Sequence, residues 1–149
     1  MRTGALTVAL LALAGCGERA APGGERIAPD LTRPETSAVS AAVPVRVGEG
    51  GAAFQACQAA GTPRSADAAL PVRTGPFDSA PAAGAIPAGA QFFVCSRSID
   101  QRWMGIVFDP AGTLSAACGV SAPVPARADY AGPCRSGWVQ SAGVRLVAD

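Results

Sequence analysis

Short apolar runs separated by turn residues follow one another from residue 52 to the end of the chain. Five runs have the length and residue types of β-strands: 52–58 (AAFQACQ), 70–73 (LPVR), 91–97 (QFFVCSR), 102–108 (RWMGIVF) and 143–147 (GVRLV). No stretch after residue 52 combines helical spacing with helix start and stop signals. Residues 79–85 are rich in Ala but contain Pro81 and Gly84, which predicts a loop. The pattern therefore predicts a small all-β domain.

The run at 102–108 is apolar on both faces. In a strand, Trp103, Gly105 and Val107 share one face, and Met104, Ile106 and Phe108 share the other. A strand with two apolar faces belongs in the middle of a domain, covered on both sides. We therefore expect this run to be the central strand.

The chain has a different character before residue 52. Pro, Gly, Ala, Ser and Thr dominate from Gly17 to Gly51, and apolar residues show no sustained period. This composition predicts a disordered tether. A short strand could form within 43–47, but Pro44 restricts it to an edge. The expected organisation is a linker at 16–51 and a domain at 52–149.

The N-terminus is built like an export signal. Arg2 precedes an apolar stretch at 5–14, which is shorter than the ~20 residues that a spanning helix needs. Leu13-Ala14-Gly15-Cys16 follows and resembles the lipobox of bacterial lipoproteins. The resemblance implies a signal peptide at 1–15, cleavage before Cys16, and acylation of this residue with palmitate-type chains that bind the membrane. An ordinary secretory signal with a chance cysteine is the alternative.

The residue after Cys16 is Gly17 rather than Asp. By resemblance to the sorting rules of Gram-negative lipoproteins, this favours the periplasmic face of the outer membrane over retention at the inner membrane. We therefore expect a lipid-anchored protein there.

The other four cysteines would face an oxidising compartment after export. Cys57, Cys95, Cys118 and Cys134 then predict two disulfides. A zinc site would need close pairs, but the spacings are 38, 23 and 16 residues, so we expect no metal. Of the three possible connectivities we favour Cys118–Cys134, which flanks a compact Pro-rich excursion, and this leaves Cys57–Cys95.

Charge and residue types restrict the chemistry. The chain has 12 basic residues, all Arg, and 11 acidic ones, with no basic block, which argues against nucleic-acid binding. It contains no His, so Ser-His and Cys-His nucleophile pairs are excluded. The aspartates after residue 52 sit in expected turns, where they serve backbone hydrogen bonding. We expect neither an enzyme nor a cofactor.

Five sequence pieces occur in an order typical of one family. They are L-P-V-R-T-G-P at 70–76, I-P-A-G at 86–89, F-V-C at 93–95, W-M-G-I-V at 103–107 and G-W-V at 137–139. Together they resemble the bacterial Src-homology-3-like (SH3-like, SH3b) domain, over roughly residues 52–149. The resemblance implies a partly open β-barrel of five to seven strands. It also places Trp138 in a tight turn at the rim of the barrel.

Two features depart from this family pattern. Eukaryotic domains of the fold hold proline-rich peptides on clustered tyrosines, but the only tyrosine here is Tyr130, so that function does not carry over. An insertion at 114–135, bracketed by Cys118 and Cys134, is long enough to be functional. We predict that Tyr130 and Arg127 near its tip form a contact surface with Trp138, and that Trp103 is a further candidate. Packing in the core or a structural staple is the alternative.

The resemblance implies a non-catalytic binding module that contacts peptidoglycan or an envelope protein. A structural or assembly lipoprotein that docks onto a membrane complex is the first alternative. The second is an inhibitor of a secreted enzyme, built on the stapled loop.

Overall fold

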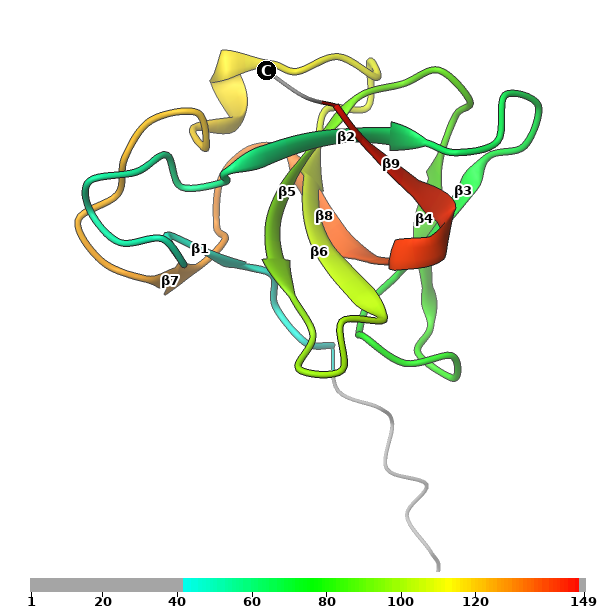
Figure 1. Cartoon of the computed structure of the whole chain (residues 1–149), viewed down its shortest axis with the longest axis horizontal. Coiled ribbons are helices and arrows are strands. Elements are labelled where there is room, and N and C mark those ends of the chain that lie inside the picture. Colours follow the sequence, from blue (N-terminus) through cyan, green and yellow to red (C-terminus); the bar gives the residue numbers. More distant parts are fainter. Residues whose placement is uncertain (1–41, 148–149) are drawn as a thin grey trace, which may run out of the picture. The chain divides into compact units, whose positions relative to one another are not determined.

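The computed structural model describes residues 42–147, and antiparallel strands make up its framework (Figure 1). The strands are β1 (Arg46–Val47), β2 (Ala59–Pro63), β3 (Leu70–Arg73), β4 (Ala82–Ile86), β5 (Phe92–Arg97), β6 (Trp103–Phe108), β7 (Ala128–Asp129), β8 (Arg135–Gln140) and β9 (Val144–Val147). Two short 3-10 helices, η1 (Ala116–Cys118) and η2 (Ser141–Gly143), lie between them. The described part of the chain is therefore all-β, as the sequence predicts.

Seven of the strands form one sheet and two form another. The large sheet has the order β4-β3-β8-β6-β5-β2-β9, and β1 pairs with β7 separately. Every pairing is antiparallel. Within residues 42–147 the end strands β4 and β9 do not pair with each other, so the large sheet is open and forms no closed barrel.

Strand β6 is the centre of the domain. It pairs with β5 on one side and with β8 on the other, and all six of its residues are buried. Trp103 and Val107 belong to one apolar cluster, whereas Met104, Ile106 and Phe108 belong to the other. This confirms the prediction of a central strand with two apolar faces.

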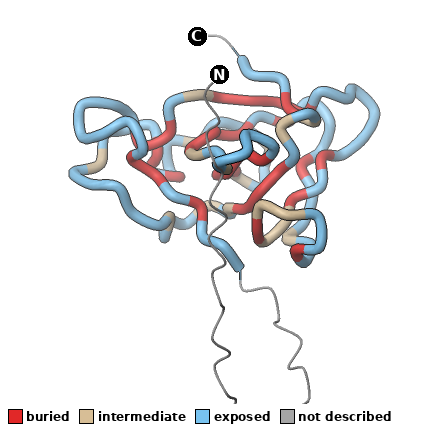
Figure 2. The backbone as a smooth tube through the Cα atoms, turned by 60° about the horizontal axis from the view of Figure 1, so that its bottom comes forward, coloured by how far each residue is buried: buried red, intermediate tan, exposed pale blue. Residues whose placement is uncertain are grey.

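The two clusters divide the core between the two faces of the sheet. The cluster around Met104, Ile106 and Phe108 also takes side chains from β3, β4, β5, β8 and β9, so the sheet curls over a core of its own residues. The cluster around Trp103 and Val107 is covered by β1 and by the segments that carry the cysteines. Figure 2 shows the buried positions in the body of the domain and the exposed ones along its peripheral loops.

Two expected elements differ in the structure. Residues 52–58 form turns and bends, with one isolated bridge from Gln55 to Pro123, rather than a strand, and the strand follows at β2. Residues 79–85 were expected to be a loop, but Ala82–Ile86 is the edge strand β4. It forms because β3 supplies a pairing partner, with a register shift near Gly84, whose φ is +133°. Strand pairing outweighs the weak strand propensity of AAGAI.

The expected turn at Gly137-Trp138 is wrong. Both residues lie in β8, which pairs with β6 along its whole length, and Trp138 is 5% exposed. The Trp138 indole N–H donates to the carbonyl oxygen of Val43 at 2.7 Å. The ring therefore packs in the core instead of standing at a rim.

The packed residues begin upstream of the expected boundary at residue 52. Val45 and Val47 are both buried in the cluster that contains Trp103. Strand β1 begins two residues after Pro44, so this proline stays outside the ladder. The Tyr130 N–H donates to the Val45 carbonyl oxygen at 2.8 Å and ties this segment to the loop before β8. The predicted signal peptide at 1–15, Cys16 and most of the predicted tether lie outside the described residues.

Candidate functional site

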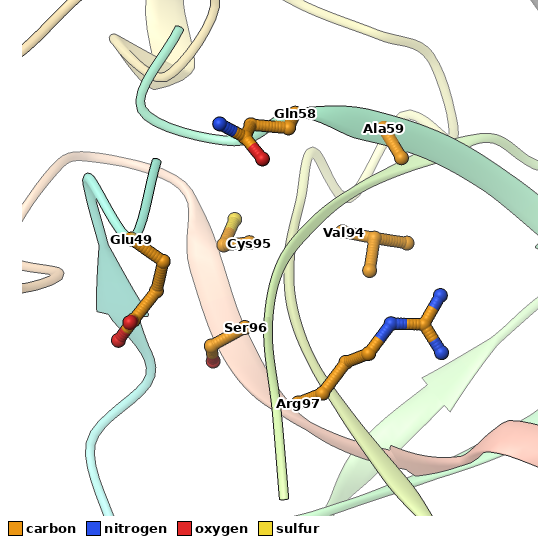
Figure 3. Close-up of a pocket in the computed structure, with 7 residues that line it drawn as sticks. All are labelled: Glu49, Gln58, Ala59, Val94, Cys95, Ser96 and Arg97. Atoms are coloured by element: carbon orange, nitrogen blue, oxygen red, sulfur yellow. The ribbon is translucent and has the colours of Figure 1, made fainter. Parts of the chain in front are cut away.

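An open cleft of about 550 Å³ lies beside the second half of β5 (Figure 3). We call it the β5 cleft. Its lining combines a carboxylate, an amide, a hydroxyl and a guanidinium with apolar side chains: Glu49, Gln58, Ala59, Val94, Cys95, Ser96 and Arg97. Figure 3 shows Glu49 and Arg97 at opposite ends, with Gln58 and Cys95 between them.

Covalent and backbone constraints fix the walls of the β5 cleft. The Cys57–Cys95 disulfide joins the segment before β2 to β5, next to Gln58. Gly48 has a φ of +78° and turns the chain after β1, and its N–H donates to the Ala56 carbonyl oxygen at 2.8 Å. A side chain there would be strained in this conformation and would meet Val124. This turn holds Glu49 at one end of the cleft.

The hydroxyl of Ser96 is buried and has no hydrogen-bond partner within the described residues. It points at Gly105 across the β5–β6 ladder, where an added Cβ would fall on the Ser96 oxygen. The absence of a side chain at Gly105 therefore makes room for Ser96 at the point where the register of this ladder shifts. The irregular ladder bends β5 beside the cleft.

The charged residues at the two ends of the β5 cleft differ in whether they form ion pairs. The carboxylate of Glu49 is 3.2 Å from the Arg127 guanidinium and 3.9 Å from that of Arg46. Within residues 42–147, Arg97 has no carboxylate within salt-bridge distance. Such exposed pairs add at most about 1 kcal/mol to stability. Because both of these ion pairs involve Glu49, Arg97 is the charged residue of the cleft lining that has no ion-pair partner within the described residues.

A second hollow of about 710 Å³ adjoins the β5 cleft through Gln58. Gly50, Ala53, Phe54 and Gln55 also line it. Phe54 is 57% exposed, a large fraction for an aromatic side chain. The two hollows together offer an extended surface with polar ends and an apolar flank.

The expected loop insertion at 114–135 is ordered by its own contacts. The Cys118–Cys134 disulfide closes it, and the Tyr130 hydroxyl bonds to the backbone of both cysteines. This hydroxyl donates to the Cys118 carbonyl oxygen at 3.1 Å and accepts from the Cys134 N–H at 3.0 Å. The Tyr130 ring also packs on the cluster around Trp103. Tyr130 therefore holds the loop together.

The structure does not bring the four predicted contact residues onto one surface. Trp103 and Trp138 are 3% and 5% exposed, and Tyr130 is half-buried with its hydroxyl bonded within the loop. Arg127 is exposed, and its ion pair with Glu49 places it near the β5 cleft. The lining residues Gln58, Ser96 and Arg97 were missed. Their signal in the sequence is the change from apolar to polar residues at the end of the FFVCSR run.

Both disulfides of the structure join the pairs favoured from the sequence, Cys57–Cys95 and Cys118–Cys134. Among residues 42–147, no group of three or more His, Cys, Asp or Glu side chains is arranged to hold a metal ion. No helix in this range has the length and apolar character required to cross a bilayer.

Comparison of the chain with family models, with curated proteins and with solved structures finds no match in any of the three. These comparisons identify no family. What they and the structure establish together is a small all-β domain with two disulfides.

Proposed function

We propose that this protein is a non-catalytic binding module of the bacterial cell envelope, held by acyl chains on Cys16 at the periplasmic face of the outer membrane. Its ligand is peptidoglycan or an envelope protein. The SH3-like resemblance and the LAGC sequence at 13–16 are the sequence basis for the proposal. Two disulfides suit an oxidising compartment outside the cytoplasm.

The observation that carries a binding function is the β5 cleft. It combines about 550 Å³ of open volume with a carboxylate, an amide and a guanidinium, on walls joined by the Cys57–Cys95 disulfide. Polar groups at fixed positions around an apolar floor are typical of a recognition site. Fixed walls also lower the entropy lost on binding.

Retention on the cell wall tests the ligand. We expect the mature protein to sediment with purified sacculi or with envelope proteins, and the Gln58→Ala variant to lose most of this retention because the cleft amide is gone. Arg145→Ala is the matched control, since Arg145 is exposed on β9 away from the cleft lining. Equal loss in both variants, or no retention of the unaltered protein, would refute a binding role for the cleft.

Acylation is tested separately in cells. Labelled palmitate should be incorporated into the unaltered protein and not into Cys16→Ser, because the thiol is the proposed attachment point. Cys16→Ser should also accumulate as uncleaved precursor. Equal labelling of both proteins would contradict the lipid anchor. It would have no bearing on the proposed binding role of the cleft.

A further inference from the structure

The outer edge of β5 is covered by a neighbouring strand along only half of its length. Strand β2 pairs with it over three positions, and the last is Ala59 opposite Val94. Strand β5 continues to Arg97. Within residues 42–147 no strand pairs with Cys95–Arg97 on this side, but the Cα of Cys57 lies 4.0 Å from that of Cys95 and covers this residue, so the open part of the edge is Ser96–Arg97. The β5 cleft lies along this uncovered part.

The backbone of Arg97 faces the uncovered side. The next residue, Ser98, donates its N–H to the Trp103 carbonyl oxygen at 3.0 Å, toward β6. Along a strand the N–H and C=O groups of successive residues point to alternate sides. Those of Arg97 therefore point away from β6, and no loop or turn backbone group within residues 42–147 bonds to them. An N–H and a C=O group that face outward without a partner can form hydrogen bonds with another strand.

The side chains beside this edge favour an acidic partner. Arg97 is exposed and has no carboxylate partner within residues 42–147, while Glu49 at the far end is paired with Arg127 and Arg46. Gln58 offers an amide that can donate to or accept from a peptide group. A strand rises about 3.3 Å per residue, so about two or three ligand residues span the open edge.

We propose that the open edge of β5 binds an extended acidic segment of an envelope protein, which adds to the sheet as a strand in line with β2. The main chain of the segment bonds to the backbone of Arg97, and one of its carboxylates pairs with the Arg97 guanidinium. This is recognition by strand addition. It rests on the proposed binding function and selects a protein segment over peptidoglycan as the ligand.

A pair of substitutions at one position separates the backbone from the side chain. Arg97→Ala removes the guanidinium and keeps the N–H, whereas Arg97→Pro removes both. Proline should be tolerated because this N–H is not used in the β6 ladder. Urea unfolding of both variants establishes that they fold, and any excess loss of binding by Arg97→Pro then reports the N–H.

The probe is a phage-displayed library of random octapeptides, selected on the lipid-free mature chain. We expect enriched peptides with alternating apolar residues and an Asp or Glu. A synthetic peptide of the enriched sequence should bind Arg97→Ala about fivefold more weakly and Arg97→Pro about fivefold more weakly again. The Arg97 amide should also exchange more slowly with solvent in the complex.

Three outcomes overturn the inference: no enrichment, enriched peptides without acidic residues, or equal binding by Arg97→Ala and Arg97→Pro. Sacculus sedimentation of Arg97→Pro distinguishes this failure from that of the proposed function. If Arg97→Pro is retained on sacculi as well as the unaltered protein and no peptide is enriched, peptidoglycan is the ligand. The proposed binding function then stands and the strand-addition proposal fails. If the mature protein binds neither peptides nor the envelope, both the proposed binding function and the strand-addition proposal are refuted.

Discussion

The hydroxyl of Tyr130 joins the two ends of the loop that the Cys118–Cys134 disulfide closes. It donates to the Cys118 carbonyl oxygen and accepts from the Cys134 N–H, while its ring rests on the core. A half-buried side chain with two such bonds acts on the free energy of unfolding, since the backbone groups lose their partner when it is removed.

We expect Tyr130→Phe to lower the free energy of unfolding by about 1–2 kcal/mol, because the ring stays and two hydrogen bonds are lost. Urea unfolding measures this change. The neighbouring exposed Asp129, changed to Asn, is the control and should change stability little. If Tyr130→Phe is as stable as the control, the two hydrogen bonds of the hydroxyl do not stabilise the loop, and Tyr130 again becomes a candidate contact residue.

Two glycines in the central ladder have different neighbours. An added Cβ at Gly105 would meet the Ser96 hydroxyl and would lie 3.1 Å from a methyl of Val45. At Gly137 it would meet Val72 and would lie 2.8 Å from the backbone oxygen of Arg73. A side chain can be shortened, whereas the backbone of a paired strand cannot move without loss of the ladder.

We therefore expect both Gly105→Ala and Gly137→Ala to destabilise the domain by roughly 1–3 kcal/mol, and only the first to be rescued by a second substitution. Ser96→Ala should recover part of the loss in Gly105→Ala, since it removes the clashing oxygen, which has no hydrogen-bond partner in the described chain. Thermal unfolding of the single and double variants gives the coupling. Equal effects of Ser96→Ala in both glycine variants would contradict a contact between Ser96 and residue 105.

At the scale of the element, the hairpin between β5 and β6 is fixed by its side chains. The Ser98 hydroxyl donates to the Asp100 carboxylate at 2.5 Å, and the Arg102 N–H donates to it at 3.1 Å. These bonds, with that from Ser98 the stronger, lower the pKa of Asp100 below its ordinary value. The hairpin thus presents Ile99 fully exposed on an ordered turn.

The lowered pKa gives this hairpin a pH dependence. We expect the contribution of Asp100 to stability to be complete above the ordinary aspartate pKa and to be lost as pH falls through the lowered one. NMR titration of the Asp100 carboxylate measures its pKa directly. Ser98→Ala should raise that pKa toward the ordinary value, because the main hydrogen bond is gone. A titration unchanged by Ser98→Ala would assign the shift to another group.

The two disulfides close loops of different length. The Cys57–Cys95 pair is separated by 38 residues and the Cys118–Cys134 pair by 16. We expect replacement of either pair by Ala to cost about 3–4 kcal/mol, with the larger loss at Cys57–Cys95, since longer loops restrict the unfolded chain more. Urea unfolding of the two double variants compares them. A smaller loss at Cys57–Cys95 would contradict this order.

Strands with a sustained apolar run could be predicted from the sequence, and strands defined by their neighbours could not. The runs at 91–97 and 102–108 became β5 and β6 because their own side chains fill both sides of the core. The sequences AAGAI and RSGWVQ, which form β4 and β8, carry no such run. Their conformation is decided by pairing with β3 and β6.

The candidate site was predicted less well, for a related reason. Residue type points to Tyr, Trp and Arg as contact residues, but the type of a side chain does not reveal on which side of a sheet it will lie. Trp103 and Trp138 fill the core, whereas Gln58 and Arg97, two ordinary polar residues, line the cleft. How much of the β5 edge is covered depends on the residue at which β2 begins, Ala59, and this is decided by the strand pairing.

At the scale of the whole molecule, the segment before residue 52 is part of the folded unit. Val45 and Val47 are 1% and 6% exposed, and the Val43 carbonyl accepts from the Trp138 indole. Each buried valine contributes roughly 1.5 kcal/mol or more. The domain therefore needs residues that composition alone assigns to a tether.

We expect a fragment that starts at residue 52 to be less stable than one that starts at residue 36 by at least about 3 kcal/mol, or to remain unfolded. Denaturant unfolding followed by tryptophan fluorescence compares them, since Trp138 loses its hydrogen-bond partner in the shorter fragment. A fragment that starts at residue 42 is the control and should match the longer one. Equal stability of all three would show that β1 is dispensable.

The position of Cys57 has a mechanical consequence. If the chain is pulled from its N-terminal side, β1 can peel away from β7, followed by the turns up to Ala56. At Cys57 the load passes through a covalent bond to Cys95 in β5, a strand that pairs with β6 and β2. The yielding length from residue 43 to residue 57 is then roughly 50 Å. Once this segment is extended, the tension acts on the strands in the middle of the large sheet. The N-terminal segment therefore lengthens by a limited amount before the sheet itself resists the force.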